Sequence, residues 1–272
     1  MDYGDLFFFD EARLQQLAEA RRAGYASASP FPHAVIDDFL PEPIVDALSR
    51  AFPEKGQLDW QQFDAAAEKK LATHRVMDLP PVLRHVLMQF NSAEVCRFLE
   101  TLSGIEHVLP DPHFAGGGLH RIEPGGFLKV HVDFNRQPEF ELDRRLNLIV
   151  YLNEDWDESF GGHLELWNQD MSECAQRVLP IRNRCVVFST TATSYHGHPD
   201  PLTCPPGRAR RSIAFYYYTN GRPVEERGES LTTQFRARPG ESIRERTPMR
   251  QIVKKFIPPI VLDLGRAALG RR

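Results

Sequence analysis

The stretch FLKVHVDF, residues 127–134, is an apolar run that carries a histidine and an aspartate two residues apart. Successive side chains of a β-strand point to opposite faces, so His131 and Asp133 would share one face. A buried carboxylate is costly unless something compensates its charge. A bound cation, an arginine or a network of hydrogen bonds would each serve, and this pair alone does not choose between them.

The composition is that of an ordinary globular chain. Of 272 residues, 42% are hydrophobic and 26% charged, and a net charge of −4 gives no reason to expect a nucleic-acid partner. No apolar run approaches the roughly 20 residues that span a bilayer. The acidic start, MDYGDLFFFDE, lacks the features of a signal peptide. Four scattered cysteines without a CxxC pair predict reduced thiols and a cytoplasmic location.

The first part of the chain has helical patterns. Residues 10–24 have helical spacing and end in a glycine, and residues 30–53 predict a short strand followed by a helix from about Pro43. A further helix is expected over 81–103, closed by Gly104. From about residue 110, short β-rich runs separated by Gly, Pro, Asn and Asp predict an all-β sandwich or barrel.

These patterns divide the chain into three regions of unequal character. We expect a helical and strand support region over 1–110, a β core over 111–220 that belongs to the same domain, and a basic extension over 221–272. Residues 241–272 hold eight basic and three acidic residues beside an apolar stripe. A helix packed on the core with a solvated basic face is the favoured interpretation. Attachment to an anionic membrane surface or to an acidic partner is the alternative, which Pro258-Pro259 weakens by interrupting the helix.

A third candidate ligand follows a later buried run, RCVVFSTTATSYHGHPD, which delivers His196. Two histidines and one carboxylate form the facial arrangement typical of non-haem Fe(II), with positions left open for other ligands. His198 competes for this role, but Gly197 and Pro199 indicate that the chain is already turning there. We therefore prefer His196.

The run RARRSIAFYYYT, residues 208–219, offers a cation for a co-substrate. A 2-oxoacid that chelates iron needs a positive group for its far carboxylate. By alternation Arg210 and Ser212 share one face of the strand, and Arg211 lies on the other. A guanidinium beside a hydroxyl suits a carboxylate, so we favour Arg210 over Arg211.

Four blocks in this order resemble the Fe(II)/2-oxoglutarate dioxygenases, specifically the prolyl 4-hydroxylase-like branch, over roughly residues 30–220. The blocks are PGGFLKVHVDF, RRLNLIVYLNEDWDESFGGHLELW, NRCVVFSTTATSYHGHP and RRSIAFYYY. The resemblance implies a mainly β protein with flanking α-helices, built on a double-stranded β-helix (jelly roll) core.

The resemblance also implies site residues. The catalytic iron ligands would be His131, Asp133 and His196. The residues for 2-oxoglutarate would be Arg210, Tyr151 and Ser212. The implied cofactors are Fe(II), with 2-oxoglutarate and O2 as co-substrates and ascorbate as an optional reductant. The interval from His196 to Arg210 is longer than usual for this branch because of an inserted DPLTCPPG segment. The family often has a tyrosine upstream of the iron-binding strand that contacts the oxoacid, and here Arg121 or His120 would take that role.

The expected reaction is hydroxylation of an aliphatic C–H, in a prolyl residue of a peptide or in a small metabolite, with release of succinate and CO2. The intact carboxylate of Asp133 argues against the related halogenases, which replace it with a small residue. A cupin-like metalloenzyme that does not use 2-oxoglutarate and a non-catalytic jelly-roll binding protein are the alternatives. Four basic residues expected near the mouth would suit an anionic substrate, although surface solvation explains them equally well: Lys129, Arg136, Arg144 and Arg145.

Overall fold

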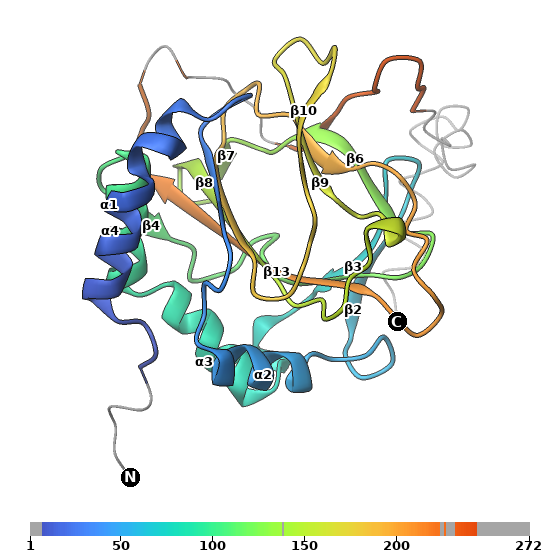
Figure 1. Ribbon diagram of the computed structural model, residues 1–272, viewed down its shortest axis with the longest axis horizontal. Coiled ribbons are helices and arrows are strands. Elements are labelled where there is room, and N and C mark those ends of the chain that lie inside the picture. Colours follow the sequence, from blue (N-terminus) through green and yellow to red (C-terminus); the bar gives the residue numbers. More distant parts are fainter. Residues whose placement is uncertain (1–6, 138, 224–225, 227–231, 244–272) are drawn as a thin grey trace, which may run out of the picture.

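The computed structural model describes residues 7–137, 139–223, 226 and 232–243, in which a curled antiparallel sheet is covered on one side by helices (Figure 1). The α-helices are α1 (Glu11–Ser27), α2 (Glu42–Ala51), α3 (Pro81–Phe90) and α4 (Ala93–Ser103), with short 3-10 turns at Val76–Asp78 and Glu158–Phe160. None of the helices in the described ranges is both long and apolar enough to cross a membrane.

The helix boundaries follow from capping. Asp10 caps α1 by accepting a hydrogen bond from the backbone N–H of Arg13 at 2.6 Å. The expectation of one helix over 81–103 was wrong, because the backbone leaves the helical region at Ser92, which has φ −77° and ψ 163° and directly precedes α4. Gly104 does close α4 in the left-handed conformation, with φ 74°, as a glycine can without strain.

The sheet is made of short strands. They are β1 (His33–Ile36), β2 (Trp60–Asp64), β3 (Glu68–Thr73), β4 (Leu109–Pro110), β5 (Gly118–Ile122), β6 (Phe127–Val132), β7 (Arg136–Gln137), β8 (Leu142–Tyr151), β9 (Leu164–Trp167), β10 (Cys174–Val178), β11 (Cys185–Ser189), β12 (His196–His198), β13 (Arg210–Thr219) and β14 (Gln234–Phe235). Their order is β1-β11-β8-β13-β5-β3-β6-β12-β9-β10. β3 joins two layers by pairing with β5 on one side and with β6 on the other. This is a double-stranded β-helix, or jelly roll.

Two long central strands, β8 and β13, separate the helices from the interior of the jelly roll. On one face, apolar side chains of both strands pack with the helices in the main hydrophobic core: Leu146, Leu148, Val150, Ile213, Phe215 and Tyr217. On the other face, alternate residues of the same strands line a cavity: Asn147, Ile149, Arg210, Ser212, Ala214 and Tyr216. The alternation of a strand therefore places the asparagine, arginine and serine side chains of this set on the cavity side.

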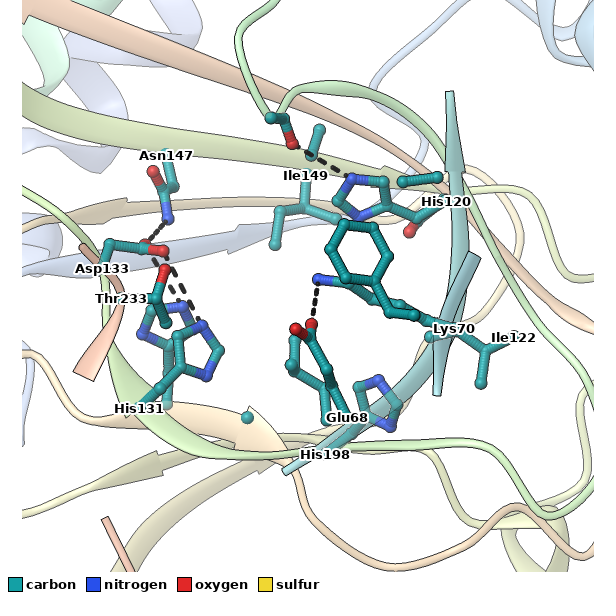
Figure 2. Close-up of a pocket in the computed structure, with 18 of the residues that line it drawn as sticks. Glu68, Lys70, His120, Ile122, His131, Asp133, Asn147, Ile149, His198 and Thr233 are labelled. Atoms are coloured by element: carbon teal, nitrogen blue, oxygen red, sulfur yellow. Dashed lines mark hydrogen bonds and ion pairs between the residues drawn. The ribbon is translucent and has the colours of Figure 1, made fainter. Parts of the chain in front are cut away.

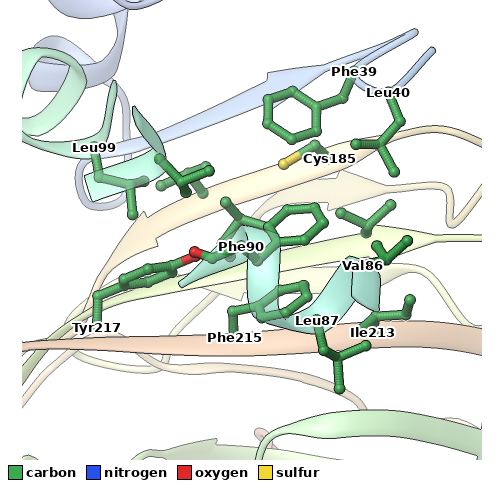
Figure 3. Packing of buried hydrophobic residues seen from close by; sticks show 14 of the residues in the cluster. Phe39, Leu40, Val86, Leu87, Phe90, Leu99, Cys185, Ile213, Phe215 and Tyr217 are labelled. Carbon is green, nitrogen blue, oxygen red and sulfur yellow. The ribbon is translucent and has the colours of Figure 1, made fainter. Parts of the chain in front are cut away.

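The main core lies between the helices and this sheet (Figure 3). Phe90 at the end of α3 stacks on Phe215 of β13, with ring centroids 4.0 Å apart and planes 14° apart. The Tyr217 hydroxyl donates to the Phe90 carbonyl at 2.8 Å, which satisfies a carbonyl at the helix end. These contacts fix α3 against the back of the strand that carries Arg210.

The front region contributes to the sheet as well as to the helical layer. β1 pairs with β11, and the hairpin of β2 and β3, which the sequence patterns did not predict, joins the sheet beside β5. From the region after residue 220, β14 adds to the free side of β6. The division of the chain at residues 110 and 220 stays a prediction, and the basic segment from residue 244 onward lies outside the described residues.

Candidate functional site

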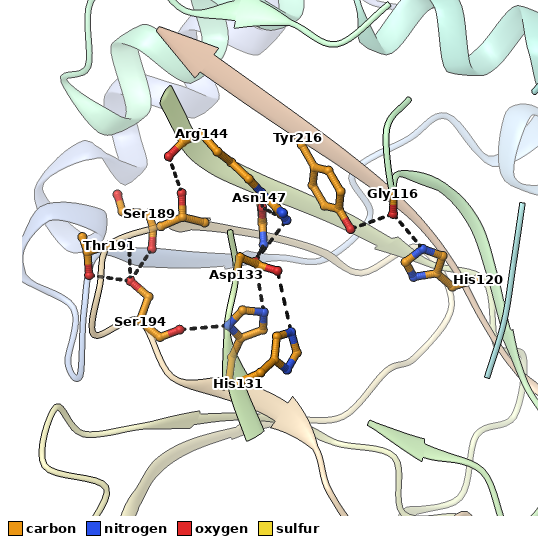
Figure 4. A network of polar contacts seen from close by, with 12 residues as sticks. Gly116, His120, His131, Asp133, Arg144, Asn147, Ser189, Thr191, Ser194 and Tyr216 are labelled. Carbon is orange, nitrogen blue, oxygen red and sulfur yellow. Dashed lines mark hydrogen bonds and ion pairs between the residues drawn. The ribbon is translucent and has the colours of Figure 1, made fainter. Parts of the chain in front are cut away.

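Three side chains that could hold a metal ion meet at one end of β6 and β12 (Figure 4). His131 lies on β6, Asp133 comes directly after the last residue of this strand, and antiparallel pairing sets His196 of β12 beside His131. One ligand atom from each of the three lies within 4.8 Å of the others, and each residue is at least nine-tenths buried. We call His131, Asp133 and His196 the metal cluster.

Backbone hydrogen bonds orient both histidines of the metal cluster. The Nδ1 atom of His131 lies 2.9 Å from the Lys129 carbonyl, and that of His196 lies 2.9 Å from the Ser194 carbonyl. Because a carbonyl only accepts, each Nδ1 carries the proton and each Nε2 presents a lone pair. The two Nε2 atoms lie 3.7 and 3.4 Å from carboxylate oxygens of Asp133.

The protonation states of the three side chains favour a bound cation. Burial lowers the pKa of His131 to about 3 and also lowers the pKa of His196, so both rings are neutral near pH 7. Burial would raise the pKa of Asp133, but the charge of Arg144, the two histidines and the Asn147 amide together hold it well below its usual range. Two lone pairs thus face a carboxylate with no proton between them, which is the donor set of a divalent metal site.

Arg144 and Asn147 of β8 hold the carboxylate in place. Arg144 Nη2 lies 3.0 Å from Asp133 Oδ2, and the Asn147 amide donates to the same oxygen at 2.7 Å. The Arg144 guanidinium also donates to Asn147 Oδ1 and lies 3.4 Å from the ring centroid of Tyr216. Sequence reasoning had placed Arg144 at the mouth for an anionic substrate. The structure instead buries it against Asp133, 11 residues away in the chain.

The other basic residues expected at the mouth are also engaged. Lys129 pairs with Glu241, Arg136 lies 3.9 Å from Asp143, and Arg145 lies 3.0 Å from Glu226. Their charges are thus compensated by neighbouring acids. They give no support to an anionic substrate.

A cavity of about 230 Å³ extends from the metal cluster between the two layers. Arg210 lines it from β13 and is 4% exposed. Its Nε donates to the Gly162 carbonyl at 2.8 Å and its Nη2 to the Tyr151 hydroxyl at 3.2 Å. Among the described residues no carboxylate lies within ion-pair distance of Arg210, and burial lowers the pKa of the guanidinium. A buried cation with only neutral partners is suited to an anionic ligand.

The remaining residues expected near the 2-oxoacid divide between the two faces. Ser212 lines the cavity and is paired in register with Tyr151, whose ring is fully buried. Arg211 points the other way and donates to the Leu152 carbonyl at 3.0 Å. Upstream, His120 lines the cavity, whereas Arg121 faces outward to Glu54 and Glu123 and is not available to it.

Sequence reasoning missed a second polar group in the cavity, on the wall away from the metal cluster (Figure 2). Lys70 and Glu68 of β3 form an ion pair of 3.1 Å there, beside His120 and His198. The sequence pattern predicts a turn at His198. In the structure residues 196–198 form a strand, so His198 also faces inward, displaced along the strand from Asp133. The hairpin that supplies Lys70 was not predicted either.

The fold and this site define a jelly-roll protein with a two-histidine, one-carboxylate metal centre. Residues 117–241 match the family model described as the 2OG-Fe(II) oxygenase superfamily. The matched segment holds the metal cluster and Arg210, and the fold is similar to that of a solved prolyl-4-hydroxylase. The family description names 2-oxoglutarate and Fe(II), and the metal cluster has the donor set for such an ion.

Known proteins with similar sequences or structures point the same way. The chain is 27% identical over 201 residues to "Prolyl 3-hydroxylase OGFOD1" of Xenopus laevis, covering 70% of this chain and 35% of that protein, so it spans about a third of that relative's length. A prolyl-4-hydroxylase of Pseudomonas putida superposes with a TM-score of 0.54 at 18% identity, over 75% of this chain and all of that one. A prolyl hydroxylase of Trichoplax adhaerens, solved with a hypoxia inducible factor peptide fragment, has a TM-score of 0.54 at 14% identity, over 76% and 91%.

Proposed function

We propose that the protein is an Fe(II)/2-oxoglutarate-dependent hydroxylase that acts on a prolyl residue of a peptide or protein. The observation that carries the reaction type is the conjunction, in one cavity, of the metal cluster with a buried arginine that lacks an acidic partner. The substrate part rests on the 27% identity to a prolyl 3-hydroxylase. Free proline or another small metabolite is the alternative substrate class.

In this proposal the metal cluster holds Fe(II), and Arg210 holds the far carboxylate of 2-oxoglutarate with Tyr151 and Ser212. When bound, the iron supplies the redox chemistry that couples decarboxylation of 2-oxoglutarate by O2 to hydroxylation of a substrate C–H. One oxygen atom enters the substrate and the other enters succinate, and CO2 leaves.

The residues of the chain supply orientation and exclude water. The Nδ1 hydrogen bonds of the two histidines keep each Nε2 lone pair aimed at the metal position. Arg144 and Asn147 keep Asp133 ionised and fix its rotamer. Apolar side chains of the cavity wall, Phe134, Ile149 and Leu164, limit the access of water to the reacting groups.

The first test is spectroscopic. Anaerobic addition of Fe(II) and 2-oxoglutarate should produce the weak visible charge-transfer band of the chelate, and Asp133→Ala should abolish it. Asp170→Ala, on an exposed turn away from the cavity, is the control and should keep the band. If the wild-type protein gives no band and consumes no 2-oxoglutarate, the proposal fails.

A second test identifies the substrate. The enzyme is incubated with Fe(II), 2-oxoglutarate and either a proline-containing peptide library or free proline. Under the proposal, peptides gain the mass of one oxygen on a prolyl residue with stoichiometric succinate, and Asp133→Ala gives neither product. Modification of free proline with none of peptides would overturn the peptide assignment and leave the reaction type intact.

A further inference from the structure

His198 is a buried side chain without a hydrogen-bond partner. It is 4% exposed, and neither ring nitrogen has a partner among the residues that the structure describes. It follows His196 by two residues on β12, so both side chains face the cavity. Buried polar groups in folded proteins are nearly always paired, so an imidazole left open toward a cavity indicates a ligand that binds there.

The position of the ring relates it to the anion-binding end of the cavity. Arg210 lines the cavity from the opposite layer, and burial together with the charge of Arg210 lowers the pKa of His198. Figure 2 shows His198 beside Glu68 on the wall away from the metal cluster. Register explains this position, because Leu128 pairs with Glu68 on one side and with His198 on the other.

The spacing along β12 suits a five-carbon dicarboxylate. Two residues of an extended strand advance the chain by about 6.6 Å, so His198 lies about that far along the strand from His196. Four carbon–carbon bonds of about 1.5 Å each span about 5 Å when extended, and the carboxylate oxygens lengthen this further. A 2-oxoacid chelated at the metal cluster therefore brings its far end level with His198.

The hydrogen-bonding capacity of a carboxylate accounts for the ring. A carboxylate has about four acceptor positions. The Arg210 guanidinium keeps three N–H groups beyond those accepted by Gly162 and Tyr151, the Tyr151 hydroxyl still has its own proton to donate, and Ser212 supplies another hydroxyl. We propose that His198 donates a further hydrogen bond to the far carboxylate of 2-oxoglutarate and thereby strengthens the preference of the cavity for dicarboxylic 2-oxoacids. This inference rests on the proposed function.

The test compares two ligands of equal chain length. 2-Oxoglutarate and 2-oxovalerate share five carbons and the chelating oxoacid group, but only the first has a far carboxylate. Their dissociation constants are measured by calorimetry on the anaerobic Fe(II)-loaded protein, so that the readout is binding. The variants are His198→Leu, which removes the donor, and His198→Asn and His198→Gln, which place an amide donor near Nδ1 or Nε2. His33→Leu, a buried histidine outside the cavity, is the control.

A hydrogen bond to a charged group predicts that His198→Leu weakens 2-oxoglutarate binding by about tenfold to a hundredfold and leaves 2-oxovalerate binding unchanged. One of the two amide variants should recover most of the loss, which also serves as evidence if the leucine variant folds poorly. Unchanged 2-oxoglutarate binding in His198→Leu overturns the inference, and so does an equal loss for both ligands, since that would indicate packing. If wild-type protein does not bind 2-oxoglutarate at all, the proposed function fails together with it.

Discussion

Replacement of Arg210 by methionine should separate ligand binding from stability. Methionine keeps the length and apolar stem of the side chain but removes the charge. Removing one partner of a buried, hydrogen-bonded charge pair costs about 2–5 kcal/mol. Because 1.4 kcal/mol is a factor of ten, the affinity for 2-oxoglutarate should fall by about 30-fold to several thousandfold. The assay is calorimetric titration of the anaerobic Fe(II)-loaded protein.

The ligand-free protein should respond differently. The variant loses two hydrogen bonds to neutral groups, the Gly162 carbonyl and the Tyr151 hydroxyl, worth about 1 kcal/mol each. It also loses a buried charge that has no acidic partner in the described part of the chain, which offsets the loss. We therefore expect the free energy of unfolding in urea to stay within about 1 kcal/mol of wild type.

Arg211→Met is the matched control, since the neighbouring guanidinium faces away from the cavity and donates to a backbone carbonyl. It should leave 2-oxoglutarate affinity unchanged. Wild-type affinity in Arg210→Met would refute the assignment of the far carboxylate to this residue. A loss in Arg211→Met with none in Arg210→Met would show that the wrong arginine had been chosen.

Three further predictions concern the strands, the titrating groups and the core. In Gly197→Ala the new Cβ would lie 2.8 Å from the Leu128 carbonyl oxygen, so β12 must move away from β6. The affinity for Fe(II), measured by competition with a chelator, should fall by about 10- to 100-fold. Unchanged affinity would show that the strands tolerate the shift. In the metal-free protein the pKa of His131 is lowered to about 3 by burial, so the unfolded chain takes up the proton first. The contribution of His131 to the free energy of unfolding should thus be greatest above about pH 6.5 and decline toward pH 3 by up to about 1.4 kcal/mol per pH unit. Urea titrations in which His131→Asn has the same pH slope as wild type would contradict this. Phe90→Ala removes the ring stacked on Phe215 and should lower the free energy of unfolding in urea by about 3–5 kcal/mol. The affinity for 2-oxoglutarate should stay unchanged, because Arg210 lies on the other face of β13. A loss under about 1 kcal/mol would mean that the stacked pair is not a core contact.

Local pattern sufficed for a large part of the fold and for the choice of candidate ligands. Alternation along a strand is a property of the backbone, so HVD in an apolar run already places His131 and Asp133 on one face. The same rule separates Arg210 from Arg211, and the structure has Arg210 in the cavity and Arg211 outside it. The order of the four blocks along the chain predicted the jelly roll, which the structure and the family match confirm.

Helix breaks and weak strands were less predictable. Asn91 and Ser92 are ordinary residues within a helical pattern, and the break between α3 and α4 is supported by a tertiary hydrogen bond from the Asn91 amide to the Asp111 carbonyl. The hairpin of β2 and β3 carries mixed polar residues and becomes a strand pair because β3 fills the position between β5 and β6. Neither contact is visible in the local sequence.

For the strands that the pattern predicts, backbone alternation alone tells which side chains share a face. Which of the inward groups meet depends on the three-dimensional fold. It buried Arg144 against Asp133 instead of leaving it at the mouth, supplied Lys70 from an unpredicted strand, and left His198 unpaired opposite Arg210. These pairings depend on which strands become neighbours and on how the two layers face one another, and those are set by packing of the whole sheet and its helices.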